Sequence, residues 1–375
     1  MTNNGKSGSS GLTKASDLFV RCLEAEGVTH IFGVPGEENA DVMMSLMDSS
    51  IDFVLCRHEQ AAAFMADTYG RLTGRPGVCL ATLGPGATNL VTGVADANMD
   101  RSPLVAIIGQ ASTSRLHKES HQNMDAIAMF RPITKWAHSI GNAKTIPEVV
   151  RKAFKVATTE KPGATVIELP EDLAKVQLSA APMPVDVTRR PAADHKAVAS
   201  AIDLIAAAKR PLILAGNGTV RKRASVQLRR LAKKSGIGVV NTFMGKGAVS
   251  LDDPHCLFTI GLQGRDHITA AFEDADLVVA VGYDLVEYGP GFWNAKGDKT
   301  IIHIDFEPAE IDTDFPVAVD VVGDIADALW QINEAMNKRF GDKLPLFDIA
   351  DRAELRATIS ADLTGEAEDT AFPMK

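Results

Sequence analysis

The sequence predicts an α/β protein with two domains, each built on a doubly wound parallel sheet. Its 375 residues exceed the length of a typical single domain, which is about 100–200 residues. Short runs that are apolar throughout alternate with longer segments in which apolar residues recur every three or four positions. Uniformly apolar strands between amphipathic helices are typical of parallel sheets that helices cover on both faces.

The first predicted domain covers residues 13–173 and begins with a helix. Thr13 is expected to cap this helix, and Gly27 suits the left-handed position just after its end. Apolar residues follow helical spacing at Ala15, Leu18, Phe19, Cys22 and Leu23. Strands are expected at 28–34, 51–56, 78–83, 104–109 and 164–169, and helices near 40–47, 59–72, 87–98 and 146–159. Residues 111–140 break the alternation and are expected to form loops and a short helix.

A second alternating set predicts a central α/β domain over residues 194–340. A linker with three prolines, 174–193, precedes it. Strands are expected at 211–215, 238–243, 277–281 and 300–305, and helices near 195–208, near 223–234 and after Gly323-Asp324. Residues 1–12 are interpreted as a flexible tail. Residues 341–375, which are polar and suggest no regular element, are interpreted as a linker toward a third domain that this sequence lacks.

Composition excludes several classes of function. The formal net charge is −9 and no long basic run occurs, so no nucleic-acid partner is expected. The longest uncharged stretch, 76–95, contains Gly84-Pro85-Gly86, which favours a strand, a turn and a helix over a membrane span. The N-terminus has no apolar signal segment, and the four cysteines form no C-x-x-C pair. A reducing, cytoplasmic location is therefore expected.

Three motifs follow predicted strands of the first domain. They are Val34-Pro35-Gly36, Arg57-His58-Glu59, and Gly84-Pro85-Gly86 with Asn89. The carboxyl ends of parallel strands form the ligand crevice of such sheets, so the three motifs are expected to meet in one site. Each motif alone also has a structural explanation, because Pro-Gly turns are common in loops and the helix dipole favours a glutamate at a helix start.

Two other patterns lead nowhere by themselves. His58-Glu59 is not a zinc motif, because alanine stands where the second histidine would be. Gly216-Asn217-Gly218 does not continue into a complete G-x-G-x-x-G, so a dinucleotide fingerprint is not expected there.

In combination, Val34-Pro35-Gly36, the stretch from Arg57 to Ala66 and Gly84 to Asn89 resemble the pyrimidine-binding domain of thiamine-diphosphate (thiamine pyrophosphate) enzymes of the acetolactate synthase group. The resemblance extends over roughly residues 13–340, with a Rossmann-like central domain. His121 to Asp125 with Met129-Phe130, and Gly282 to Tyr288 before Trp293-Asn294, are similar to the catabolic acetolactate synthases.

The resemblance implies a role for each motif residue. Glu59 would hold N1′ of the aminopyrimidine and exchange a proton with it, so that the cofactor can lose its C2 proton. His121 and Gln122 would line the substrate side and hold the developing oxyanion. The implied catalytic residues are Glu59, His121 and Gln122, and the implied cofactor-binding residues are Val34, Pro35, Gly36, Glu59, Pro85, Gly86 and Asn89.

The resemblance also implies what lies outside these motifs. Related enzymes bind the diphosphate through Mg²⁺ in another domain marked by Gly-Asp-Gly, which this sequence lacks, so no metal ligand is assigned here. The chain is therefore expected to be a fragment that is inactive alone. Its expected partners are further copies of itself, in a homodimer or homotetramer, or a separate chain with the diphosphate domain. FAD is not expected, because the stretch from Val281 to Tyr288 lacks the arginine of flavin-binding relatives.

The expected reaction joins two pyruvate molecules into 2-acetolactate with release of CO₂. Two alternatives remain at this point. One is a different thiamine-diphosphate enzyme that decarboxylates another 2-keto acid. The other is a non-catalytic chain that acts as a partner or regulator.

Overall fold

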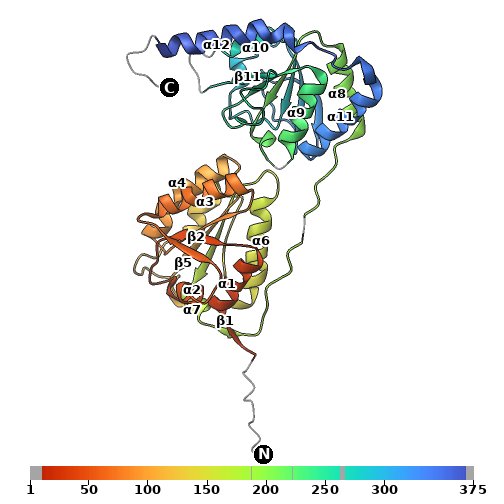
Figure 1. Cartoon of the computed structure of the whole chain (residues 1–375). Helices are drawn as coiled ribbons and strands as arrows, with labels where there is room; N and C mark the ends of the chain where they lie inside the picture. Colours follow the sequence, from red (N-terminus) through yellow and green to blue (C-terminus); the bar gives the residue numbers. More distant parts are fainter. Residues whose placement is uncertain (1–10, 187, 222, 262–266, 369–375) are drawn as a thin grey trace, which may run out of the picture. The chain divides into compact units, whose positions relative to one another are not determined.

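Each of two units in the chain contains a six-stranded sheet whose strands are all parallel. The computed structural model describes residues 11–186, 188–221, 223–261 and 267–368 (Figure 1). The units are Met1–Thr188 and Arg189–Lys375. The predicted fold class, two α/β units with doubly wound parallel sheets, is confirmed.

The sheet of the first unit has the order β3-β2-β4-β5-β7-β6. Its strands are β2 (His30–Gly33), β3 (Asp52–Leu55), β4 (Gly77–Ala81), β5 (Leu104–Gln110), β6 (Trp136–Ser139) and β7 (Ala164–Pro170). The chain adds β3 on one side of β2 and then crosses to place β4 on the other side. The carboxyl ends of β2 and β4 therefore form the point where strand order reverses, which is where ligands bind in open α/β sheets.

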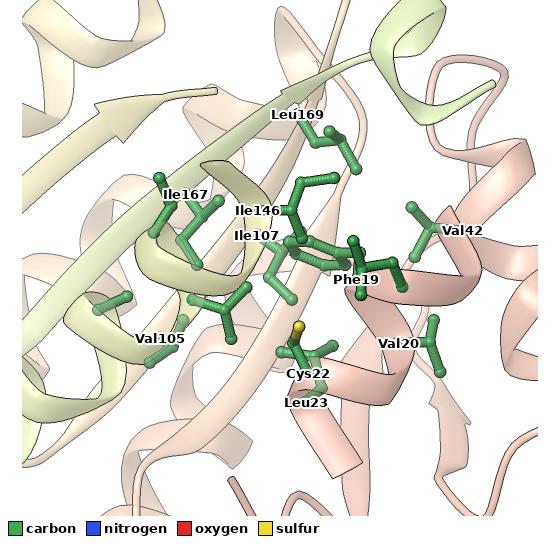
Figure 2. Close-up of a cluster of buried hydrophobic side chains, with 14 of the residues drawn as sticks. Phe19, Val20, Cys22, Leu23, Val42, Val105, Ile107, Ile146, Ile167 and Leu169 are labelled. Carbon is green, nitrogen blue, oxygen red and sulfur yellow. The ribbon is translucent and has the colours of Figure 1, made fainter. Parts of the chain in front are cut away.

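Helices cover both faces of this sheet. On one face α1 (Ala15–Ala25), α2 (Ala40–Leu46) and α6 (Ile146–Thr158) share a core with alternate strand residues. Figure 2 shows Phe19 of α1, Ile146 of α6 and Ile107 of β5 in this core. On the other face, α3 (Glu59–Thr73) and α4 (Pro85–Met99) pack on the remaining strand residues, such as Ala106 and Ile108, which alternate with those of the first core. Every residue of β5 is thus buried, as expected of a strand covered on both faces.

Local signals explain where several helices begin and end. Gly27, with φ of 81°, follows α1 as predicted, and Gly74, with φ of 67°, ends α3. The prediction that Thr13 caps α1 is wrong. Lys14 occupies the cap position, while Thr13 belongs to β1 (Thr13–Lys14), which pairs antiparallel with β8 (Gln177–Leu178).

The sheet of the second unit has the order β11-β10-β9-β12-β13-β14. Its strands are β9 (Pro211–Ala215), β10 (Gly238–Asn241), β11 (Cys256–Thr259), β12 (Leu277–Val281), β13 (Thr300–Asp305) and β14 (Val317–Val322). Three helices pack on one face of this sheet: α8 (His195–Ala207), α9 (Ala224–Ser235) and α11 (Ile325–Phe340). On the opposite face, α10 (Thr269–Glu273) and α12 (Ala353–Glu368) contribute to a second core. Strand order reverses between β9 and β12.

Some regular elements were not predicted. Residues 111–140 contain the edge strand β6 in addition to the expected short helix, α5 (Ala126–Phe130). The segment after 340, interpreted as a linker, includes α12, whose Ile359 is 1% exposed and packs into the second unit. Arg352 also donates a hydrogen bond to the Pro211 carbonyl at 3.3 Å. Within the described ranges, no helix combines the length and apolar character that crossing a membrane requires.

Candidate functional site

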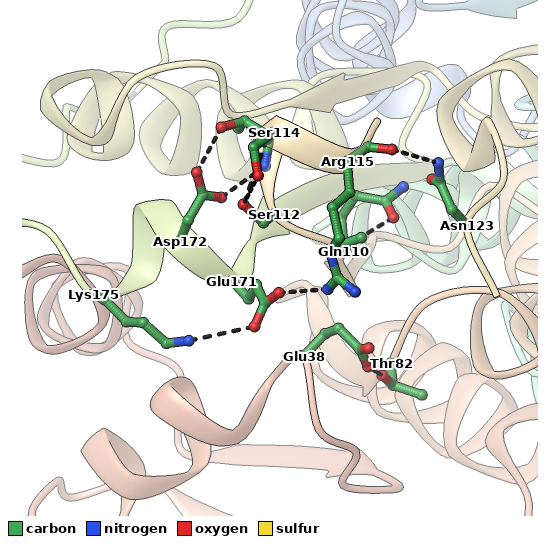
Figure 3. Close-up of polar contacts among 12 residues, drawn as sticks. Glu38, Thr82, Gln110, Ser112, Ser114, Arg115, Asn123, Glu171, Asp172 and Lys175 are labelled. Atoms are coloured by element: carbon green, nitrogen blue, oxygen red, sulfur yellow. Dashed lines mark hydrogen bonds and ion pairs between the residues drawn. The ribbon is translucent and has the colours of Figure 1, made fainter. Parts of the chain in front are cut away.

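The turns that follow β2 and β4 touch each other at the carboxyl end of the first sheet. A Cβ placed on Gly36 would lie 2.4 Å from Thr82 Cβ, so only glycine allows this approach. The Gly36 N–H donates to Asn39 Oδ1 at 2.9 Å. The Thr82 hydroxyl donates to Glu38 Oε2 at 2.8 Å (Figure 3). The predicted motif Val34-Pro35-Gly36 therefore lies at the crevice, with Val34 partly buried and Pro35 exposed.

Replacing Gly36 with alanine is expected to separate these two turns. The added Cβ would overlap Thr82, and relief of such overpacking costs about 1–3 kcal/mol of unfolding free energy. Gly141→Ala is a matched control, because nothing lies within 4 Å of a Cβ at Gly141. Urea denaturation of the three proteins checks this expectation. Equal midpoints for Gly36→Ala and wild type would show that the turns do not depend on the contact.

Glu59 and Asn89 meet across two helices. Glu59 is the first residue of α3, and Asn89 lies in the second turn of α4. The Asn89 side-chain amide donates to Glu59 Oε2 at 2.9 Å. A Cβ on Gly86 would lie 3.4 Å from Glu59 Oε1 and 2.9 Å from Thr82 Cγ2. Thr82 thus contacts both the turn after β2 and the start of α4 beside Glu59. The predicted residues Glu59, Gly86 and Asn89 lie together, and Pro85 is the first residue of α4.

The packing of α3 on α4 sets the distance between Glu59 and Asn89. A Cβ on Gly93 would lie 2.6 Å from Ala63 Cβ, so the absence of a side chain lets the two helices approach closely. Farther along the helices, Arg71 of α3 forms ion pairs with Asp67, Asp96 and Asp100 at 2.8–3.1 Å. These contacts hold both helices at the ends away from the site.

Gln122 packs against the turn after β4. The side chain of His121, the preceding residue, forms no hydrogen bond or ion pair with the residues that the structure describes. Gln122 has φ of 54°, an unusual backbone conformation for a residue other than glycine. A Cβ on Gly84, which itself has φ of 52°, would lie 2.6 Å from the Gln122 carbonyl oxygen. Both His121 and Gln122 are exposed. Backbone strain of this kind often marks functional sites and supports a role for the 121–122 turn.

A buried polar pair on β5 and β7 was not singled out from the sequence. The Gln110 amide donates to Glu168 Oε2 at 2.9 Å and to the Met124 carbonyl at 3.2 Å. Burial raises the pKa of Glu168, although hydrogen bonds from Ser139 and Gln110 oppose the shift. The pair ties the loop that carries Gln122 to the centre of the sheet. A charged residue inside an otherwise apolar strand was the signal that could have found it.

Ion pairs fix the start of the same loop (Figure 3). Arg115 Nη2 lies 2.6 Å from Glu171 Oε1, and Lys175 Nζ lies 3.3 Å from Glu171 Oε2. Asp172 accepts hydrogen bonds from the backbone N–H of Thr113 at 2.9 Å and from its hydroxyl at 2.5 Å. The segment between β5 and α5 is therefore held at the carboxyl edge of the sheet, beside the candidate site.

The arrangement fits an aminopyrimidine ring. Glu59 is half-buried, one carboxyl oxygen is held by Asn89, and the other faces Gly86, where a side chain would crowd it. A flat ring with a ring nitrogen and an exocyclic amine can approach a carboxyl group presented this way. Across the ranges that the structure describes, no group of three or more His, Cys, Asp or Glu side chains is arranged to hold a metal ion.

Comparison with known families matches both units. The profile of the N-terminal TPP binding domain of thiamine pyrophosphate enzymes matches residues 13–129, and the profile of their central domain matches residues 198–332. The family resemblance inferred from the motifs is thus confirmed.

Individual relatives carry the name acetolactate synthase. The enzyme of Bacillus subtilis is 39% identical over 339 residues, which is 88% of this chain and 58% of the relative. The catabolic acetolactate synthase of Raoultella terrigena is 38% identical over 86% of this chain and 58% of its own length. A chloroplastic enzyme of Nicotiana tabacum is 36% identical over 91% of this chain and 52% of its own length. The chain spans little more than half the length of these relatives.

Proposed function

The chain belongs to the thiamine pyrophosphate enzymes, and we propose that it forms the pyrimidine-binding side of an acetolactate synthase active site. The observation that carries the proposal is the pairing of Glu59 with Asn89 beside Gly86, at the crevice where strand order reverses. The similarity to acetolactate synthases supports pyruvate as substrate and 2-acetolactate and CO₂ as products.

Bound thiamine diphosphate would supply the electron sink that makes decarboxylation and carbon–carbon bond formation possible. Glu59 is proposed to exchange a proton with N1′ of the pyrimidine. Asn89 orients that carboxyl group, because its amide donates to Oε2 and leaves Oε1 to face the crevice. Val34, Pro35 and Gly36 are proposed to contact one side of the ring, and Pro85 and Gly86 the other.

Gln122 is proposed to act on the substrate side. Its position against Gly84 places the 121–122 turn next to the helix start that carries Gly86. An amide donor there can hydrogen-bond the oxygen on which negative charge develops. His121, its neighbour in the same exposed turn, is proposed to share this role.

The diphosphate and its Mg²⁺ are proposed to be held by residues outside this sequence, which contains no Gly-Asp-Gly. We propose that the site is completed in an oligomer, either a homodimer or homotetramer that includes a diphosphate domain or an assembly with a separate chain.

A cytoplasmic location is also proposed. All four cysteines are buried and form no disulfide, which supports a reducing compartment.

The test is reconstitution. The 375-residue chain alone, given pyruvate, thiamine diphosphate and Mg²⁺, is expected to form no acetolactate above background. Mixed with a diphosphate-binding domain from an acetolactate synthase, it is expected to form acetolactate. Turnover by the chain alone would overturn the proposed division of the site.

The two alternatives give different results in the same experiment. A decarboxylase of another 2-keto acid would release CO₂ from that acid without forming acetolactate from pyruvate. A non-catalytic chain would bind the added domain and yet give no product with any 2-keto acid.

A further inference from the structure

A buried carboxyl group lies at the point of the second sheet where strand order reverses. The order β11-β10-β9-β12-β13-β14 places β9 beside β12, with Leu214 opposite Ala280. Sheets of this order bind dinucleotides across the crevice at that point, with the pyrophosphate on backbone N–H groups that follow the first strand. The residues after β9 and β12 therefore decide whether a dinucleotide can enter.

The two turns at this crevice are in direct contact. The Gly218 N–H donates to the Gly282 carbonyl at 2.8 Å. A Cβ on Gly218 would lie 2.6 Å from Gly282 Cα, and one on Gly216 would lie 2.5 Å from Tyr283 Cα. Gly282 has φ of 55°. The turns after β9 and β12 are therefore held against each other next to Glu287, whose Oε1 would lie 2.9 Å from a Cβ on Gly216.

Glu287 occupies the hydrogen-bonding position of an anion. Its side chain is 4% exposed, and its two oxygens accept from the Asn217 N–H at 3.0 and 3.1 Å. Its Oε1 also accepts from the Asp284 N–H at 2.9 Å, and its Oε2 accepts from the Thr242 hydroxyl. Thr242 is fixed in turn, because its hydroxyl oxygen accepts from the Gly245 N–H at 2.9 Å. Asn217 follows β9 directly after Gly216.

We propose that Glu287 is an internal substitute for the phosphate groups of a dinucleotide and that it closes the central domain of this chain to FAD and related dinucleotides. A pyrophosphate would have to displace a buried carboxyl group that accepts from three residues. It would also bring further negative charge next to Asp284. The residues present therefore do not fit a dinucleotide. Glu287 is the proposed physical reason why FAD is not expected to bind.

Removing the carboxylate leaves its donors without an acceptor, so the experiment asks whether an added anion can replace it. Glu287→Ala is expected to lower Tm at pH 8 by about 5 °C or more, because buried donors are left unpaired. Inorganic pyrophosphate is expected to raise the Tm of this variant in a saturable way, since it binds the folded state only. Wild type and Glu310→Ala, which removes an exposed glutamate of the same domain, are expected to show no such response.

Several results would overturn the proposal. One is a folded Glu287→Ala whose Tm does not respond to pyrophosphate, and another is an equal response in wild type. If Glu287→Ala does not fold, fluorescence titration of wild type with FAD decides. No saturable binding is expected up to about 1 mM, whereas a Kd below about 0.1 mM would show an open site. None of these measurements depends on acetolactate formation, so they stand apart from the proposed function.

Discussion

Glu59→Gln is expected to slow acetolactate formation by about 10²–10⁴-fold in an enzyme reconstituted from this chain and a diphosphate-binding domain, since general acid–base catalysis typically contributes that factor. Glutamine has nearly the same volume as glutamate, and its carbonyl oxygen can still accept from Asn89. It cannot pass a proton to the pyrimidine nitrogen. The loss is therefore expected in the proton transfer and not in cofactor binding.

The free energy of unfolding is expected to change little in Glu59→Gln. Glu59 is half-buried, and the substitution leaves no buried charge without a partner. If Glu59 served only as a favourable charge at the start of α3, the substitution would cost about 0.3–1 kcal/mol of unfolding free energy and leave turnover unchanged. The proposed role predicts the opposite pattern, with slow turnover and near-normal stability.

Exchange of the cofactor C2 proton, followed by NMR in deuterated buffer, measures the step directly. Glu148→Gln is a matched control, because Glu148 is an exposed glutamate in the first turn of α6. It undergoes the same change at a helix start away from the crevice and is expected to exchange at the wild-type rate. Equal exchange in Glu59→Gln and wild type would remove Glu59 from the mechanism.

The central strands of both sheets, such as β5 and β12, were predictable because they are buried on both faces and their sequences are apolar throughout. The edge strand β6 lacks that signal. β6 is only partly buried and contains His138, so its residues do not stand out from a loop. The segment that forms α12 carried a weak signal that was missed, since Leu355, Ile359 and Leu363 recur at every fourth position. The packing of Ile359 into the core of the second unit stabilises α12, and such a tertiary contact cannot be read from the local sequence.

The candidate site divides in the same way. Glu59, Gly86 and Asn89 were predictable because each stands in a recognisable motif after a strand. The bond between Thr82 and Glu38 joins residues 44 apart, and that between Gln110 and Glu168 joins residues 58 apart. Neither pair has a local pattern, because strand order alone brings its members together. The same holds for Gly84 and Gln122, whose contact depends on where the chain returns after β5.

The stability of the chain is expected to fall as pH rises through neutrality, because of Glu287. Burial raises the pKa of this carboxyl group to about 7, hydrogen bonds from Asp284, Thr242 and Asn217 oppose the shift, and the nearby charge of Asp284 adds to it. In the unfolded chain the group ionises near its ordinary value of 4.5. Between these two values the unfolded state releases a proton that the folded state keeps, so each increase in pH favours unfolding.

The expected size follows from the two pKa values. The contribution of Glu287 is at its most favourable below about pH 4.5 and is lost by about 2–3 kcal/mol between pH 5 and pH 8. Glu287→Gln, which cannot ionise, should lack this part of the pH dependence. Its unfolding free energy, relative to wild type, is therefore expected to rise by the same amount over that range.

Urea denaturation of wild type, Glu287→Gln and Glu310→Gln at pH 5, 6, 7 and 8 makes the comparison. Glu26 and Glu168 also have pKa values raised by burial, but both are present in all three proteins and cancel in the difference. Two titratable side chains, Asp284 and Tyr283, act near Glu287 and are present in all three proteins, and burial raises the pKa of Tyr283 so that it does not ionise in this range. Glu310→Gln should follow wild type, since Glu310 is exposed. A constant difference between Glu287→Gln and wild type would mean that the carboxylate is already ionised at pH 5, with its hydrogen bonds outweighing its burial.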